Sequence, residues 1–399
     1  MKALLFLQRT RADALRCRMR YDGASAATAR RMGLDERWGP VRHLMSTGCS
    51  LRTDLALRGV SALVMQNDLL DVTVLTGRGT DIISFVYRPS GVNLLWRSRT
   101  GVRNPATDLA PSPDPSSSYM DYYPGGWQEI FPNGGDPCVY RGAALGFHGD
   151  ICKVSWDYEV ERTDAQAVQV RCWTQAVRMP FFVEKRLRLE AGSPTLVIEE
   201  RIVNESDEVL ECMWGHHPTF GAPFLSPACR LTVPARAVET HPDPLPGRQR
   251  LPRGLRGTWP VIPGADGRPV DLRQMPGPQS RSSDVCYLTE LEEGWYALQN
   301  METGLGFALV WDVRVFPYIW LWQECCGTRG YPWWGREYVC GIEPHSSIPG
   351  CGLLRAIERG TALRVGPRAA VEQRLLATAF QNAAPVERVT SEGTVVFGR

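Results

Sequence analysis

The hydrophobic pattern from residue 69 onward is that of short β-strands. Residues 70–74 (LDVTV) and 82–87 (IISFVY) are β-branched and aromatic runs that end close to Gly or Pro, which is typical of strands. The run 368–378 fits either a helix or a last strand, and helical periods of useful length are otherwise almost absent. Further strand-like runs lie at 295–299, 306–311, 318–322 and 362–365.

An alternating pattern marks the middle of the chain. In residues 183–190 (VEKRLRLE), all the charges except Lys185 fall on one face of an extended chain. Residues 195–203 (TLVIEERIV) follow and end at the polar turn 204–207 (NESD). We therefore expect an antiparallel hairpin or meander here. Many short strands, few short helices and long loops predict a mainly β fold of large, stacked antiparallel sheets.

The chain divides unevenly. Residues 1–55 lack a sustained period, so we expect a partly ordered or peripheral N-terminal extension, followed by a single β-sandwich domain over residues 56–399. Seven arginines between positions 9 and 31 favour a poorly ordered extension over a nucleic-acid arm. The stretches 103–118 and 241–283, rich in Pro, Gly and Ser, are expected to form binding loops or flexible insertions.

Composition narrows the possible partners. The formal charge is +2, from 45 basic and 43 acidic residues, which gives no general field for nucleic acid or an anionic membrane. The apolar run 3–7 is short for a signal peptide, and no stretch approaches a membrane span. The 12 cysteines include no C-x-x-C pair. We expect a cytoplasmic protein with reduced thiols, as a monomer or a homodimer joined at strand edges.

Two glycine-rich segments are candidates for ligand binding. Residues 122–135 (YYPGGWQEIFPNGG) lead to 146–150 (GFHGD), which contains His148. Glycines let the backbone approach a ligand closely, and the interleaved aromatic rings offer flat faces to the C–H side of a sugar. The alternative is a glycine-rich surface loop whose aromatic residues cover the edge of the sheet, which would account for the same residues.

A histidine pair lies in residues 213–221 (MWGHHPTFG). Because side chains alternate along an extended chain, only one of His216 and His217 should face a given cleft unless a bulge intervenes. A single histidine is more often structural than catalytic.

The last candidate is Glu343 in residues 341–350 (GIEPHSSIPG). It follows an apolar strand and precedes Pro344, so partial burial would raise its pKa towards that of a useful general base. The plain alternative is a carboxylate that caps the next turn. The preceding segment is dense in aromatic residues, namely Trp320, Trp322, Tyr331, Trp333 and Trp334.

Taken in order, these motifs resemble the aldose 1-epimerase (galactose mutarotase) superfamily, and most closely its divergent mutarotase-like branch. The resemblance covers roughly residues 60–380 and depends on Gly-Trp near Phe-Pro-Asn-x-Gly, then His148-Gly, His217-Pro-x-Phe and Glu343-Pro. It implies a β-supersandwich whose concave face binds a small-molecule sugar, and an enzyme, an isomerase, that interconverts the sugar's anomers.

The resemblance also implies roles for residues. His217 would protonate the ring oxygen, Glu343 would take the proton of the C1 hydroxyl, and His148 would be a second contact to the ring oxygen or a hydroxyl. The chemistry requires no metal or organic cofactor. Six further residues are expected to contact the sugar: His216, Trp127, Glu129, Arg141, Trp322 and Trp334.

The sequence departs from better-known members of the superfamily. Thr219 occupies a position where those members usually have an aromatic residue, and the doubled histidine leaves both His216 and His217 as candidates. The usual early arginine motif has no clear counterpart, although Arg88, Arg97 and Arg141 are candidates. Arg141, Arg329 and Arg336 could bind an anionic group on the sugar, or they could be solvated surface residues.

Two other functions fit the same residues. One is a carbohydrate-binding protein that retains the groove without the chemistry. The other is a metal-dependent sugar isomerase or lyase, with His148, one of His216 and His217, and Glu343 as zinc or manganese ligands. The absence of tight H-x-H or H-x-x-x-H spacing counts against that second alternative.

Overall fold

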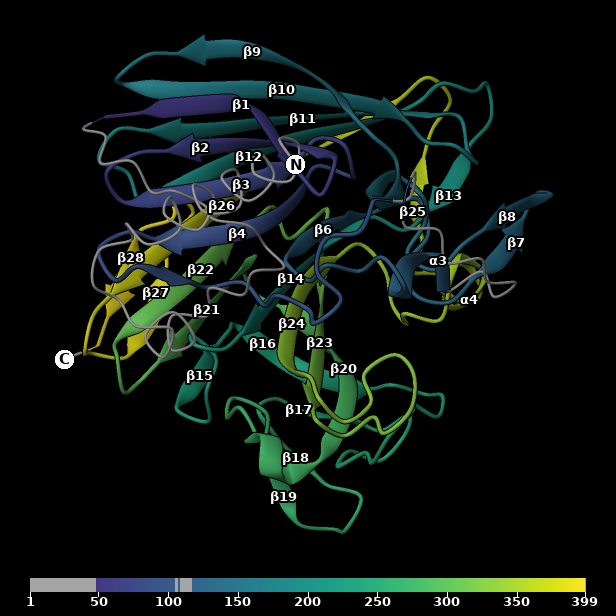
Figure 1. The fold of residues 1–399 in the computed structure, drawn as a ribbon. Helices are drawn as coiled ribbons and strands as arrows, with labels where there is room; N and C mark the ends of the chain where they lie inside the picture. Colours follow the sequence, from purple (N-terminus) through teal and green to yellow (C-terminus); the bar gives the residue numbers. More distant parts are fainter. Residues whose placement is uncertain (1–47, 105–106, 108–116, 399) are drawn as a thin grey trace, which may run out of the picture. The chain divides into compact units, whose positions relative to one another are not determined.

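In the computed structural model, residues 48–104, 107 and 117–398 are described, and their strands form two large antiparallel sheets (Figure 1). The first sheet has 12 strands in the order β1-β2-β3-β4-β6-β14-β24-β23-β20-β16-β17, with β5 beside β4. Its strands are β1 (Ser50–Leu57), β2 (Val60–Gln66), β3 (Leu70–Leu75), β4 (Asp81–Tyr87), β5 (Val92–Asn93), β6 (Trp127–Ile130), β14 (Gly215–Gly221), β16 (Ala235–Thr240), β17 (Arg256–Thr258), β20 (Ser282–Leu291), β23 (Tyr318–Cys325) and β24 (Tyr338–His345).

The second sheet has eight strands in the order β15-β21-β22-β26-β12-β11-β10-β9. These are β9 (Asp157–Thr163), β10 (Ala167–Gln175), β11 (Phe181–Glu190), β12 (Thr195–Asn204), β15 (Cys229–Thr232), β21 (Trp295–Asn300), β22 (Leu305–Val310) and β26 (Ala370–Gln381). Four two-stranded sheets pair β7 (Cys138–Tyr140) with β8 (Ala143–Leu145), β13 (Leu210–Cys212) with β25 (Leu363–Val365), β18 (Val261–Pro263) with β19 (Pro269–Asp271), and β27 (Val386–Val389) with β28 (Val395–Phe397).

Helices are few and short in the described residues. They are α3 (Ser117–Met120) and α4 (Leu353–Arg359), with the 3₁₀ turns η2 (Ile151–Lys153) and η3 (Pro278–Ser280). No helix in this part of the chain is long and apolar enough to cross a lipid bilayer. The expected mainly β class with few short helices is therefore confirmed.

The two segments with alternating patterns form the strands that the patterns predict. β11 and β12 pair antiparallel in a continuous register from Phe181 opposite Asn204 to Leu189 opposite Leu196. The ambiguous run 368–378 became a strand, because β26 lies between β12 and β22 and pairs with both. The first sheet begins at β1, a few residues before the expected boundary at residue 56. Residues 1–47 lie outside the described part.

The hydrophobic core lies between the two large sheets. Phe85 on β4 meets Phe307 on β22 with ring centroids 5.5 Å apart, and Leu63, Leu187 and Ile198 are buried with them. A smaller apolar cluster on the second sheet includes residues of β21, β22 and the β27–β28 hairpin. Long loops cover part of the other face of the first sheet, and together with the strands they line a cavity there.

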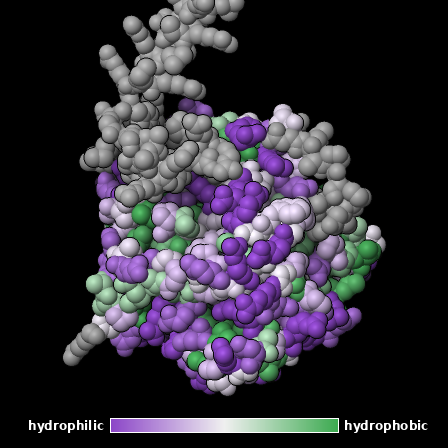
Figure 2. Space-filling view, turned by 60° about the horizontal axis from the view of Figure 1, so that its bottom comes forward, coloured by the Kyte–Doolittle hydropathy of each residue, from purple (hydrophilic) through white to green (hydrophobic). Residues whose placement is uncertain are grey.

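The mixed surface (Figure 2) and the buried, unpaired cysteines of the described residues are typical of a folded domain. On the face shown in Figure 2, hydrophilic and hydrophobic residues are intermingled. None of the 11 cysteines in the described residues is in a disulfide, and nine of the 11 are buried.

Candidate active site

The two adjacent histidines of β14 lie on opposite faces of the first sheet. Gly215 pairs with His345 and Thr219 with Gly341 on β24. The register between these pairs sets His217 opposite Glu343 on one face. His216 lies opposite Glu129 of β6 and points the other way, between the sheets. The alternation expected from the sequence therefore separates the two rings.

A row of side chains crosses the sheet at His217. Gln128 on β6 pairs with His217, and across β24 Glu343 pairs with Trp320 of β23, which pairs with Tyr287 of β20. Because paired residues share a face, His217, Glu343, Trp320 and Tyr287 line the same side of the sheet. All four line one cavity.

The acid–base groups meet at this cavity. Nε2 of His217 lies 3.4 Å from Oε1 of Glu343, and the rings of His217 and His148 are 5.2 Å apart between centroids. All three side chains are at least nine-tenths buried. Gly341 makes room for the carboxylate, because a Cβ at that position would overlap Oε1 of Glu343.

His148 is held in an unusual backbone conformation. Its φ is +56°, in the left-handed region that costs a non-glycine residue about 1–3 kcal/mol. Its backbone N–H donates to the carbonyl of Gly135, and the N–H of Gly135 donates to Nδ1 of His148, both at 3.1 Å. Because Nδ1 accepts this bond, the proton of the neutral ring lies on Nε2. Burial, with His217 nearby, holds the pKa of His148 well below its usual value.

Burial also controls the protonation of the opposing pair. Desolvation raises the pKa of Glu343 well above its ordinary value and lowers the pKa of His217 to about 4. Both shifts favour uncharged side chains, since neither group has a fixed cation or anion beside it to offset the loss of water. The pair is therefore suited to sharing one proton.

A hydrogen-bonded chain orients His217 from behind. Its Nδ1 lies 3.1 Å from the hydroxyl of Tyr123, which is 3.4 Å from Oγ1 of Thr219. Thr219 in turn donates to the carbonyl of Gly126 at 2.6 Å. Thr219, the departure noted in the sequence, thus belongs to the support of His217.

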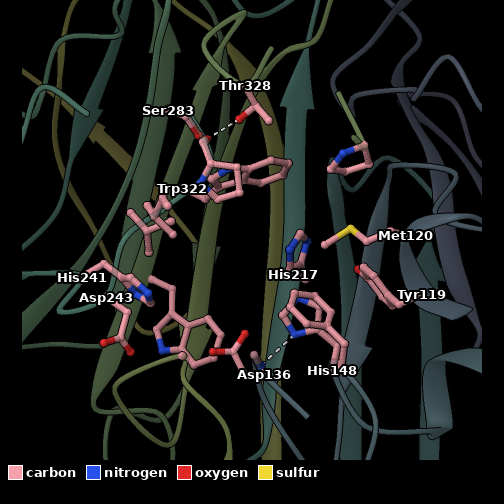
Figure 3. A pocket seen from close by; sticks show the side chains of 18 of the residues that line it. Tyr119, Met120, Asp136, His148, His217, His241, Asp243, Ser283, Trp322 and Thr328 are labelled. Atoms are coloured by element: carbon pink, nitrogen blue, oxygen red, sulfur yellow. Dashed lines mark hydrogen bonds between the residues drawn. The ribbon is translucent and has the colours of Figure 1, made fainter. Parts of the chain in front are cut away.

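Aromatic rings form much of the cavity wall, which encloses about 320 Å³. Figure 3 shows His217, His148 and Tyr119 on one side and His241 with Asp243 on the other. Such flat faces suit the C–H side of a sugar ring. The aromatic residues on the wall are Tyr119, Tyr123, Phe147, Tyr287, Trp320, Trp322 and Trp333.

Three expected sugar contacts lie on the wrong side of the sheet for that role. His216 accepts a hydrogen bond from Nε1 of Trp127 at 2.9 Å, and its Nε2 is 2.7 Å from Glu200. Glu129 pairs with Lys185 at 2.9 Å in the same buried cluster. His216, Trp127 and Glu129 therefore fill the space between the sheets and do not line the cavity.

Two more expected sugar contacts, Arg141 and Trp334, lie outside the cavity. Arg141 is half exposed and pairs with Glu211, and Trp334 is 58% exposed outside the cavity. Its neighbour Trp333 lines the wall and packs against Trp322, which does face the cavity as expected. Arg329 lines a separate hollow with Arg248 and Arg281, and Arg336 is exposed.

Sequence reasoning missed several wall residues. Trp320 and Trp322 share one face by strand alternation, so the expectation for Trp322 also applies to Trp320. His241 and Asp243 come from a loop and Tyr119 from the four-residue helix α3, and neither segment has a period that shows which side chains point inward.

Solved structures share this architecture. A candidate aldose 1-epimerase from Klebsiella pneumoniae superposes with a TM-score of 0.65 at 17% identity, over 84% of each chain. A galactose mutarotase related enzyme from Lactobacillus acidophilus gives 0.53 at 15% identity, over 80% of this chain and 97% of its own. The chain has the galactose mutarotase-like fold.

A third solved structure shares the fold, and the sequence comparisons add less. A galactose mutarotase-like protein from Clostridium acetobutylicum has a TM-score of 0.54 but only 13% identity, over 84% and 99% of the two chains. A family described as a domain of unknown function, DUF4432, matches residues 57–249. That stretch contains His148 and His217 and ends before Glu343. None of the curated proteins matches the chain significantly.

Proposed function

We propose that the protein is an aldose 1-epimerase-like isomerase that interconverts the anomers of a sugar at this cavity. One observation carries the proposal: a buried imidazole and a buried carboxylate, 3.4 Å apart, face the same aromatic cavity with a second imidazole beside them. This is the pairing of acid and base that ring opening requires.

The reaction would move two protons. The Glu343 carboxylate takes the proton of the C1 hydroxyl, the C1–O5 bond breaks, and O5 takes the proton of His217. The open aldehyde turns about C1–C2, and the reverse steps close the ring on either face. Each positioned acid or base typically contributes about 10²–10⁴-fold to the rate.

The shared proton suits this cycle. Before ring opening the pair is charged, with the proton on His217, and afterwards it is neutral, with the proton on Glu343. Desolvation favours the neutral arrangement in the free protein. The charged arrangement is one proton transfer away across the 3.4 Å gap, so the net charge in the cavity stays constant.

His148 would act as a neutral donor. With Nδ1 occupied by the N–H of Gly135, Nε2–H is the group left to donate to a sugar oxygen. The low pKa of His148, caused by burial, argues against its acting as a cationic acid.

The wall chemistry favours a sugar with uncharged hydroxyl groups. The acidic side chains on the described cavity wall are Asp136, Asp243 and Glu343, and this wall has no Lys or Arg. Carboxylates accept hydrogen bonds from hydroxyls and repel an anionic substituent. A phosphate or carboxylate held directly in the cavity is therefore disfavoured.

The test is anomer exchange, measured by NMR or polarimetry with a panel of neutral aldoses. The wild type should exceed the buffer rate with at least one sugar. Glu343→Gln and His217→Gln should each lower that excess by about 10²–10⁴-fold, with circular dichroism unchanged. Arg141→Gln, a change at an exposed residue away from the cavity, is the matched control and should retain the full rate.

Two outcomes would count against catalysis. Exchange at the buffer rate across the whole panel would reject the proposal, and saturable binding without exchange would select a carbohydrate-binding protein. Full activity in Glu343→Gln would show that the carboxylate is not the base.

A further inference from the structure

A second cluster of reactive side chains lies on the cavity wall away from His217. His241 and Asp243 come from the loop after β16, and Cys351 follows β24. One ligand-type atom from each lies within 4.8 Å of the other two. Figure 3 shows His241 and Asp243 across the cavity from His217 and His148.

We propose that His241, Asp243 and Cys351 form a zinc-type metal site, with a fourth coordination position available to a ligand in the cavity. Imidazole nitrogen, carboxylate oxygen and thiolate sulfur are the three donor types that zinc takes in proteins. This site is separate from His217 and Glu343, and the ring-opening steps do not pass through it.

Two of the three donor separations are close to those of a tetrahedral centre, and the third, between His241 and Asp243, is within 4.8 Å. With Zn–N of about 2.1 Å and Zn–S of about 2.3 Å, two donors at the tetrahedral angle lie roughly 3.6 Å apart. Nε2 of His241 is 3.8 Å from Sγ of Cys351, and that sulfur is 3.3 Å from Oδ2 of Asp243. Adjustments of about 0.3 Å, small for side chains, would bring both pairs to this spacing.

The histidine is oriented for this role. Its Nδ1 lies 2.5 Å from the hydroxyl of Tyr287, which also accepts a bond from the N–H of Gly350 at 2.9 Å. A second hydrogen bond of this kind fixes the ring of a metal-binding histidine and leaves the other nitrogen free to ligate. Nε2 of His241 therefore points towards Cys351.

The local charge also favours a cation. Asp136 lines the same cavity wall as Asp243, so a second carboxylate lies on the wall that carries the cluster. A divalent ion would offset the charge of these carboxylates. Because the thiolate is the form of cysteine that binds metal, binding would release the thiol proton of Cys351 to solvent.

The site can serve the sugar. Asp243, Gly350 and Tyr287 line the same cavity as Glu343. A ligand held by His217 at one end would bring its far hydroxyls towards the metal, whose open position accepts oxygen. This last step rests on the proposed function, whereas metal binding itself does not.

The experiment measures zinc binding to the full chain after removal of metal with a chelator. We expect one Zn²⁺ per chain by calorimetry, with proton release, and a thiolate-to-metal absorption band when Co²⁺ replaces zinc. Cys351→Ala should abolish the band. Asp243→Asn and Cys351→Ala should each lower zinc affinity by more than about 100-fold, since losing only a partner that orients a ligand costs 10–100-fold.

Controls separate this site from others. Cys326→Ala, at a partly buried cysteine outside the cluster, should bind zinc and show the cobalt band like the wild type. His217→Gln should also bind zinc normally, even if no sugar is ever turned over. Zinc binding that survives Cys351→Ala and Asp243→Asn, or that is lost in His217→Gln, would overturn the proposal. If Cys351→Ala does not fold, Asp243→Asn, a change at a partly exposed residue, decides alone.

Discussion

Adjacent histidines on β14 occupy two buried environments that differ in how charge is compensated. On the inner face, His216 contacts Glu200, and Lys185 lies 2.9 Å from Glu129 and 3.3 Å from Glu200. On the cavity face, His217 contacts Glu343 and Tyr123, and no lysine or arginine lines the described wall.

The pKa values of Glu200 and Glu343 shift in opposite directions. Although burial opposes charge, His216 and Lys185 lower the pKa of Glu200 below its ordinary value. Burial without such partners raises the pKa of Glu343 well above it. In the inner cluster Lys185 thus supplies a counter-charge to both carboxylates, although burial and Glu200 still raise the pKa of Glu129, whereas the cavity pair has no such cation on the described wall. The same residue types thus fill the space between the sheets on one face of β14 and line the cavity on the other.

The sharpest way to break this comparison is to remove the inner cation. Lys185→Met would leave Glu129 and Glu200 buried without their shared counter-charge. Breaking a buried ion pair in this way costs about 3–5 kcal/mol, to be measured by urea unfolding at pH 7. Arg186→Met, the next residue on the exposed face of β11, is the control and should cost less than about 1 kcal/mol. Equal losses in the two variants would mean that the inner cluster is not mutually stabilising.

Acid sensitivity provides the next comparison. The unfolded chain protonates His217 near pH 6.5, whereas the pKa in the folded protein is about 4 because of burial. The stability from the neutral ring is present above pH 6.5 and is lost as the pH falls towards 4. This shift corresponds to up to about 3 kcal/mol. His217→Gln should therefore gain stability relative to the wild type over that range.

Glu343 should behave with the opposite sign. Its raised pKa means that the stability of the neutral carboxyl is present below about pH 4.5 and is lost as the pH rises through the folded value. Glu343→Gln should gain relative to the wild type as the pH increases from 4 to 8. Unfolding curves that shift in parallel for the wild type and both variants would contradict the assignment of these buried states.

The fold class could be predicted from the sequence because the alternation of side chains along a strand involves only residues adjacent in sequence. The charges of β11 predicted its exposed face, and even the exception, Lys185, had a structural meaning, since it is the one charge that points inward to Glu129 and Glu200. Period 2 also separated His216 from His217. It could not choose between them, because that choice depends on which strands lie on either side of β14.

The site was only partly readable. The motifs of Glu343 and His217 indicated two residues that both line the cavity. The expected contacts Trp127 and Glu129 instead share the inner face with His216, whereas Gln128 between them faces the cavity side. The expected contact Trp334 is exposed whereas its neighbour Trp333 lines the wall, because loop backbone has no period that distinguishes neighbours. His241 and Cys351 meet only through tertiary structure, 110 positions apart in the sequence.

The smallest predicted effect tests how finely the cavity face is tuned. Thr219→Val keeps the shape of the side chain but removes the hydroxyl that lies 3.4 Å from Tyr123 and donates to the carbonyl of Gly126. Loss of each such bond typically costs about 0.5–1.5 kcal/mol. Tyr123 would then hold His217 less firmly, so kcat for anomer exchange should fall by several-fold while KM changes little. Thr289→Val, at a buried threonine on β20 outside the cavity, is the matched control and should leave kcat unchanged. A rise in KM at constant kcat in Thr219→Val would instead mean that this threonine affects sugar binding and does not position His217.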